Sequence, residues 1–300
     1  MEKAKLTFLG TGTSQGVPII GCQCEVCRSS DARDKRFRAA ALIEYGGLSI
    51  LVDAGPDFRS QMLAAGVRHL DAILLTHNHK DHTGGLDDVR ALNYIDKCAA
   101  EIYCEERVLR SLKVEYSYAF AEDKYPGAPE WHIHTIGDSP FTIRKERYGE
   151  LTWMHDVGYG YMQPDGTFVK SKGTTVEPAP VPGDTPGTDE VTIIPIRGYH
   201  DTMPVLGFRF GDIAYITDMS SIPDEEFSKL KGLRHLTLNT VGYKRHHSHF
   251  SLEEAEAIAA RVGAEHTWLT HLSHTFPRHE EFCGILPDGI LPAYDGLTIE

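Results

Sequence analysis

The chain has 300 residues, of which 41% are hydrophobic and 24% charged, a composition typical of a globular protein with a sizeable core. Lys and Arg number 30 against 43 Asp and Glu, and the formal net charge of -13 argues against a broad basic surface for nucleic acid. No apolar run approaches the roughly 18 residues that cross a membrane, and the first ten residues lack a signal-peptide core. We therefore expect a cytoplasmic protein without membrane attachment.

Secondary structure can be predicted in chain order from apolar patterns and capping residues. Strands are predicted at 5–10, 41–45, 48–55, 71–77, 191–196, 205–211, 213–217, 235–239 and 266–270, and helices at 85–95 and 106–120. Another helix follows Pro56 and stops near Gly66, as expected for proline in a first turn and glycine at a C-terminal cap. Ser251 and Glu254 form a capping-box pattern for a helix that ends at Gly263.

Residues 173–190 are rich in Pro, Gly and Thr and contain few side chains that could pack, so we interpret them as a mobile loop. No internal repeat is evident, and the elements on either side of the loop belong to one predicted domain, 1–300. Strands and helices are mixed without regular alternation. This order favours an α/β sandwich over a doubly wound sheet.

The segment HNHKDH (77–82) follows a predicted buried strand and carries several metal-ligand types. A single histidine there would more often be a loop or core residue. In an extended segment, however, His77 and His79 point the same way, and a turn would bring Asp81 and His82 back toward them. Gly84 and Gly85 would permit that turn. Such a cluster would be costly without a cation, so we predict a metal site with room for two ions.

Three further candidate ligands each follow an apolar predicted strand: His200, Asp218 and His271. An Asp in that position is usually a turn former, and only the combination with the first segment makes a ligand role persuasive. Asp53 is interpreted as a helix cap, a partner of a ligand histidine, or both, but not as a ligand. The remaining candidates, His132, His134 and His155, are interpreted as surface or loop histidines.

Cys22, Cys24 and Cys27 place three thiols within six residues, which suits a tetrahedral zinc ion. A fourth ligand is missing locally. The alternative is three free reduced thiols, which would be prone to oxidation. The other cysteines, Cys98, Cys104 and Cys283, are dispersed and are interpreted as buried thiols or thiols without a special role.

These segments carry a family resemblance. HNHKDH resembles the HxHxDH signature of the metallo-β-lactamase fold superfamily. Together with GTGTSQGVPIIGCQCEVC (10–27), it makes the chain similar to the PhnP-type cyclic-phosphate phosphodiesterases, to which the tRNA 3′-processing endonucleases are related. The likeness runs from residue 5 to 300, interrupted by an insertion at about 144–190. It implies a four-layer αβ/βα sandwich with two mixed β-sheets and a dinuclear metal centre.

The resemblance also implies roles for individual residues. One ion would be held by His77, His79 and His200, the other by Asp81, His82 and His271, with Asp218 bridging the two. His274 would complete a structural zinc site with Cys22, Cys24 and Cys27. Catalysis would depend on Asp81 and on His249 as proton donor, with His247 as an alternative in register. Mn²⁺ and Zn²⁺ both suit the mixed ligands of the dinuclear site.

The expected function is that of a metal-dependent phosphodiesterase. Its substrate would be a small phosphodiester, cyclic or open, attacked by hydroxide formed at the two metals. One alternative is a tRNA 3′-processing-type endoribonuclease, against which stand the acidic charge and the spacing of only 18 positions from His200 to Asp218, too short for an RNA-binding arm. The other is a non-catalytic metal-binding module. Nucleic acid and membrane partners are not expected, and the sequence leaves a homodimer open.

Overall fold

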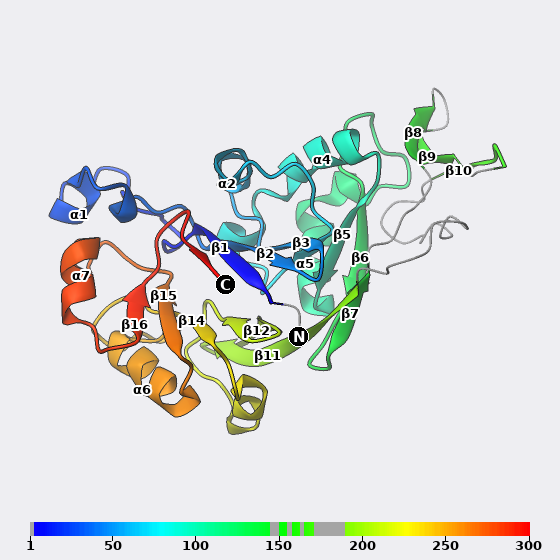
Figure 1. The fold of residues 1–300 in the computed structure, drawn as a ribbon. Helices are drawn as coiled ribbons and strands as arrows, with labels where there is room; N and C mark the ends of the chain where they lie inside the picture. The colour runs from blue at the N-terminus through cyan, green and yellow to red at the C-terminus, as the bar shows by residue number, and fades with distance from the viewer. Residues whose placement is uncertain (1–2, 145–149, 155–157, 163–164, 171–189) are drawn as a thin grey trace.

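The computed structural model describes residues 3–144, 150–154, 158–162, 165–170 and 190–300. It contains two seven-stranded sheets that face each other (Figure 1). The strands of the first sheet are β1 (Lys5–Gly10), β2 (Ala40–Tyr45), β3 (Leu48–Val52), β4 (Ala72–Leu74), β5 (Ala100–Cys104), β6 (Trp131–Thr135) and β17 (Thr298–Ile299). Their spatial order is β17-β1-β2-β3-β4-β5-β6, with β3 to β6 parallel to one another.

The strands of the second sheet are β7 (Phe141–Arg144), β11 (Glu190–His200), β12 (Met203–Phe210), β13 (Ile213–Tyr215), β14 (His235–Asn239), β15 (His266–Thr270) and β16 (Ile290–Pro292). They lie in the order β16-β15-β14-β13-β12-β11-β7, and β13 to β16 are parallel. A separate antiparallel sheet contains β8 (Glu150–Met154), β9 (Gly158–Met162) and β10 (Phe168–Lys170).

Helices cover the outer faces of the two large sheets (Figure 1). The α-helices are α1 (Glu25–Arg28), α2 (Phe58–Ala65), α3 (Lys80–Thr83), α4 (Arg90–Asp96), α5 (Glu106–Glu115), α6 (Leu252–Val262) and α7 (His279–Ile285). The 3₁₀ helices are η1 (Ala32–Asp34), η2 (Leu86–Val89), η3 (Ser117–Ala119) and η4 (Asp224–Leu230). Among the described residues, none of these helices has the length and apolar character needed to span a membrane.

Buried apolar side chains form three large clusters. Leu6 and Ile43 of the first sheet pack with Phe208 of the second between the two sheets. A second cluster joins the outer face of the first sheet to α2, η2 and α5, and a third joins the outer face of the second sheet to η4, α6 and α7. Alternating side chains thus bury both faces of each sheet. The predicted four-layer αβ/βα sandwich with two mixed sheets is confirmed.

The capping patterns correctly located two helices. Gly66 ends α2 in the left-handed conformation, with φ 66°. At the start of α6 the Ser251 side chain accepts from the Glu254 backbone N–H while the Glu254 carboxylate accepts from the Ser251 N–H. Gly263, with φ 67°, ends that helix. These helix ends could be predicted from local sequence, because the capping residues bind or accommodate backbone N–H and C=O groups that have no partner within the helix.

Some elements differ from the predictions. The strand predicted at 71–77 ends at Leu74, and the helix predicted at 106–120 ends at Glu115 and is followed by η3. The parallel strands β5 and β6 were not predicted. The interpretation of His132 and His134 as surface or loop residues is wrong, because both lie in β6 and His132 is buried. Both donate to the Glu101 carboxylate on the neighbouring strand β5.

The small sheet of β8, β9 and β10 lies within the segment interpreted as an insertion at about 144–190. In Figure 1 it stands apart from the two large sheets. The predicted mobile loop at 173–190 falls, apart from Glu190, outside the described residues, as does His155. Glu190 itself begins β11.

One edge of the sandwich collects the ends of several strands. In the first sheet β3 and β4 are parallel, so both end at the same edge. In the second sheet β11 and β13 are each antiparallel to β12 and therefore run the same way, as do β14 and β15. Residues that follow the carboxyl ends of these strands are consequently brought to one side of the molecule, the usual location of a functional site in such sheets.

Candidate functional site

The structure brings the histidine and aspartate candidates together at this edge. The loop after β4 and the short helix α3 carry His77, His79, Asp81 and His82, while His200 ends β11 and His271 follows β15. The ring centroids of His77 and His79 are 4.6 Å apart, and that of His200 lies 5.8 Å and 4.9 Å from them. The two large sheets therefore both contribute to one cluster.

Asp218, which follows β13, lies at the centre of the cluster. Its Oδ2 is 3.2 Å from His82 Nε2, and its Oδ1 is 3.1 Å from His271 Nε2. The Asp81 carboxylate is 3.3 Å from His82 Nε2. Two donors that each lie about 2.1 Å from one ion would be separated by about 3.0–3.4 Å at octahedral to tetrahedral angles. The observed separations therefore fit shared coordination of a divalent cation.

Several nitrogen atoms in the cluster are buried and have no hydrogen-bond partner: Nε2 of His77, His82 and His271, Nδ1 of His271 and Nδ1 of His249. Buried imidazole nitrogens normally find a partner, because leaving one unpaired costs free energy. Cations bound at these Nε2 atoms would remove this cost. The orphaned nitrogens are thus an independent sign that the donor set suits metal ions.

Asp53 orients two of these histidines. Its carboxylate is fully buried and accepts from His82 Nδ1–H at 2.6 Å and from the Thr76 hydroxyl and backbone N–H. Because the Thr76 hydroxyl donates to Asp53, its oxygen accepts from His77 Nδ1–H at 2.9 Å. Both imidazoles are left with Nε2 directed at the cluster, as for metal-ligating histidines with outer partners. Supporting a ligand histidine was one of the two roles expected for Asp53. Thr76 was not predicted as a site residue, because its role depends on the tertiary contact with Asp53.

The charges of the cluster respond to burial and to one another. Burial is the main cause that lowers the pKa of His77, His79 and His200, so these imidazoles are neutral, as ligands must be. Burial would also lower the pKa of His82, but Asp218 and nearby carboxylates outweigh it and raise that pKa. These carboxylates are the groups whose charge a bound cation would neutralise.

Backbone strain is concentrated at the same place. Asp53, Asp218 and His271 have φ values of 65°, 58° and 56°, in the left-handed region that side-chain-bearing residues seldom adopt. Each such residue costs of order 1–3 kcal/mol and persists only where its surroundings fix it. All three follow a strand end and direct a polar group into the cluster or its support, which indicates selection for function over local stability.

His249 lies beside the cluster, two residues before the Ser251 cap of α6. Its ring centroid is 4.6 Å from that of His200 and 4.7 Å from that of His271, and its Nδ1 is 3.8 Å from Asp218 Oδ1. Burial lowers the pKa of His249 to about 3. The alternative His247 is exposed, and its ring adjoins that of His246. The geometry therefore places His249 within reach of the cluster.

The tight backbone around α3 is explained by close approach and not by unusual dihedral angles. The expected turn is present as α3, but Gly84 and Gly85 have negative φ values, −67° and −102°, so it needs no left-handed backbone there. A Cβ on Gly85 would instead lie 2.1 Å from the Gly55 carbonyl oxygen, and a Cβ on Gly55 would lie 2.0 Å from that of Asp81. These glycines allow two segments of backbone to touch behind the ligands.

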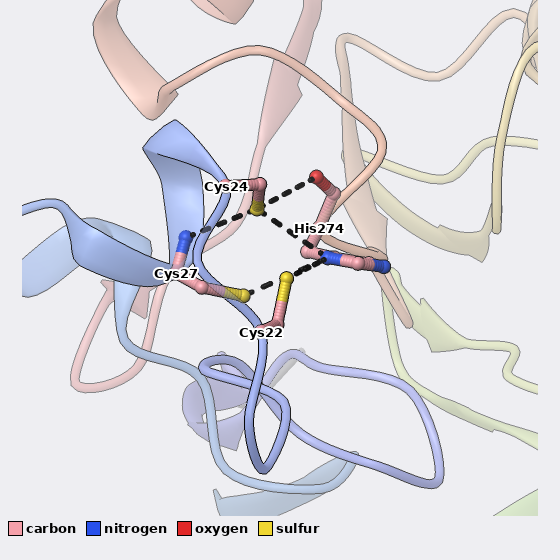
Figure 2. Close-up of side chains that lie close together, drawn as sticks. All are labelled: Cys22, Cys24, Cys27 and His274. Carbon is pink, nitrogen blue, oxygen red and sulfur yellow. Dashed lines mark hydrogen bonds between the residues drawn. The ribbon is translucent and has the colours of Figure 1, made fainter.

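A second cluster joins Cys22, Cys24 and Cys27 to His274 (Figure 2). The three sulfur atoms lie 3.3, 3.4 and 3.6 Å from His274 Nδ1. Zn–S and Zn–N bonds of usual length at the tetrahedral angle would place sulfur and nitrogen about 3.6 Å apart. The backbone N–H of Cys27, donating to the Cys24 sulfur, lowers the pKa of Cys24 to about 6, which favours the thiolate. The donor set therefore fits zinc.

The remaining cysteines lie outside this cluster. Cys104 is buried in the first sheet, whereas Cys98 and Cys283 are partly buried. Burial raises the pKa of Cys98 and of Cys104 to about 12, so both remain thiols at neutral pH. This agrees with the expectation of thiols without a special role.

Comparisons with known proteins place the chain in a family. Residues 49–272 match the model described as beta-lactamase superfamily domain. The structure matches the crystal structure of a new diphosphatase from the PhnP family, with a TM-score of 0.77 and 35% identity over 99% of this chain and 98% of that one. Zn²⁺-bound PqqB from Methylobacterium extorquens, at 18% identity and TM-score 0.65 over 99% of both chains, shares the fold.

Among curated proteins, one named octanoyltransferase from Porphyromonas gingivalis is 37% identical over 293 residues, which are 97% of this chain and 50% of that protein. The chain spans half or less of the length of the first curated relatives it matches. The name octanoyltransferase consequently describes a protein about twice as long as this chain. Taken with the fold and the two donor clusters, the family match and the structural match over 99% of this chain show that the chain belongs to the beta-lactamase superfamily and, within it, to the PhnP family.

Proposed function

We propose that this hydrolase cleaves small phosphodiesters at a dinuclear centre formed by the seven clustered ligands. The observation that carries the proposal is the carboxylate of Asp218, which stands within 3.2 Å of histidines from both sheets while their Nε2 atoms lack partners. A relative whose structure matches over 99% of this chain is a diphosphatase from the PhnP family, which supports a phosphate-containing substrate. Divalent ions at such a site would lower the pKa of a water and offset charge on a phosphoryl group.

The chain's own residues would divide the work. His77, His79 and His200 would hold one ion, Asp81, His82 and His271 the other, and Asp218 both. Asp53 and Thr76 would keep the imidazoles in the ligating tautomer through their hydrogen bonds. His249 would donate a proton to the leaving oxygen once the negative charge of a bound substrate offsets the burial that lowers its pKa, a contribution of about 10²- to 10⁴-fold in rate.

Two variants test this division. His249→Ala should retain both active-site metals and lose turnover, whereas Asp81→Ala should lose metal as well. Metal content by elemental analysis and steady-state turnover give the two readings. Equal metal loss in both variants would assign His249 a ligand role, which its closeness to His200 and Asp218 also allows, and would defeat the proposed division.

The substrate class is tested by a panel measured on the metal-loaded full-length chain. The panel contains bis(p-nitrophenyl) phosphate, a five-membered cyclic phosphate, a diphosphate diester, an acyl thioester and a β-lactam. We expect turnover of the first two. The diphosphate arm is suggested by the diphosphatase relative, and the thioester arm by the relative named octanoyltransferase. Turnover of the thioester or β-lactam alone would refute a phosphodiester substrate.

The endonuclease alternative has less support. The 18 residues from His200 to Asp218 are taken up by β12, β13 and their short turns. Salt-sensitive binding of tRNA would nonetheless favour that alternative. Full metal occupancy with no turnover of any substrate would favour the non-catalytic module. We further propose a cytoplasmic location, since three thiols gathered around a histidine suit a reducing compartment.

A further inference from the structure

Helix α5 lies against the loop that carries the first metal-ligand segment. The Asn78 side chain, between His77 and His79, donates from Nδ2 to Ser111 Oγ on α5 at 2.8 Å. The hydroxyl of Tyr116, directly after α5, donates to the Thr83 carbonyl at 2.8 Å. The ligand loop is therefore held at both ends by one helix of the outer layer.

Arg107 on α5 extends this support to the other sheet. Its Nη1 donates to Asn78 Oδ1, and its Nη2 donates to the Pro204 carbonyl at 2.7 Å. Pro204 lies in β12 opposite Tyr199 of β11, one position from His200 in the hairpin register. One rigid guanidinium thus joins the residue between two ligand histidines to the strand pair that presents the third.

The contacts of Arg107 are weak for a charged side chain, which indicates that it has a role other than stabilising the fold. Both acceptors are neutral amide carbonyl oxygens, so they provide weaker bonds than a carboxylate would. Arg107 is half-buried, and its buried Nε has no hydrogen-bond partner. A charged side chain placed in this way gains little stability from its contacts. Arg107 instead fixes the spacing between the Asn78 loop and β12, because both of its donors belong to one planar guanidinium group.

We propose that Arg107 is a positioning residue that sets the separation of His77 and His79 from His200, and with it the affinity of the metal position that these three imidazoles form. The inference rests on the proposed dinuclear centre. The other position, formed by Asp81, His82 and His271, has no contact with Arg107 and should be unaffected by its loss.

The test is a Mn²⁺ titration of the full-length chain after dialysis against a mild chelator, followed by calorimetry and electron paramagnetic resonance. Mn²⁺ is chosen because it prefers nitrogen and oxygen ligands to thiolates. The wild type should bind two Mn²⁺. In Arg107→Ala one binding step should weaken by about 10- to 100-fold, the usual effect of losing an outer-shell partner, while the other is unchanged.

Three further variants keep the result interpretable. Arg110→Ala, on the same helix, removes an exposed arginine whose side chain pairs with Glu106, and it should match the wild type. Arg107→Lys keeps the charge but cannot reach both carbonyls, so it should resemble Arg107→Ala. In the double variant with Asn78→Ala the losses should be less than additive, since the two residues act through one contact.

Arg107→Ala that binds two Mn²⁺ like the wild type, or that weakens both steps equally, would overturn the proposal. So would Arg107→Lys at wild-type affinity, because charge and not spacing would then be responsible. A wild type that binds two Mn²⁺ but cleaves no phosphodiester would refute the proposed function alone. A wild type that binds no Mn²⁺ would overturn both.

Discussion

Gly55 offers a sharp test of how the ligand loop is held. A methyl group added at this position would lie 2.0 Å from the carbonyl oxygen of Asp81, whereas real Cβ contacts stay beyond 3.0 Å. The two backbones would have to separate by at least about 1 Å. Metal-ligand distances tolerate only about 0.2 Å, so Gly55→Ala should displace Asp81 from coordination. Overpacking of this kind also costs about 1–3 kcal/mol in free energy of unfolding.

The measurement combines metal content with urea denaturation of the metal-free chain. We expect Gly55→Ala to lose active-site metal and to unfold at lower urea concentration. Gly137→Ala is the matched control, because a Cβ at Gly137 would meet no atom within 4 Å and its φ is not positive. Wild-type metal content and stability in Gly55→Ala would show that the loop adjusts freely, and would refute the view that close backbone contact fixes Asp81.

Two further predictions concern other parts of the molecule. The pKa of His69 is raised to about 9, mainly by its hydrogen bond to Asp71 and, against the opposing effect of burial, by Asp96. Because the folded pKa exceeds the unfolded value of about 6.5, its stabilising contribution is complete below pH 6.5 and disappears as the pH rises through 9; His69→Gln should therefore lower the free energy of unfolding at pH 6 and leave it unchanged at pH 10. Cys24→Ser should remove one zinc per chain in elemental analysis and lower the melting temperature, whereas Cys98→Ser, remote from the zinc cluster, should do neither; retention of zinc by Cys24→Ser would contradict the four-ligand assignment.

The fold could be predicted where local chemistry decides it. The capping residues of α2 and α6 marked those helices because a helix end must satisfy its own backbone groups. Strands β5 and β6 escaped prediction for the opposite reason. Glu101 and His132 look like surface residues in isolation, and only the pairing of two parallel strands far apart in sequence makes them partners. The period-2 alternation in WHIHT was the available signal.

The residues of the candidate site could likewise be predicted only where a local sequence pattern marks them. The ligands in 77–82 are neighbours in sequence, so their spacing alone predicted a metal site. His200, Asp218 and His271 could be proposed because each follows a strand, and strand ends gather at one edge. Arg107 carried no such sign. Its importance depends on reaching both Asn78 and Pro204, 29 and 97 residues away, and no local pattern encodes that distance.

The pairing of β1 with β17 has a consequence for biosynthesis. Leu6 and Thr7 lie beside Ile299 and Thr298, so β1 is synthesised long before the strand that becomes its outer neighbour. Until then that flank of the nascent sheet exposes unsatisfied peptide groups, a template for unwanted association.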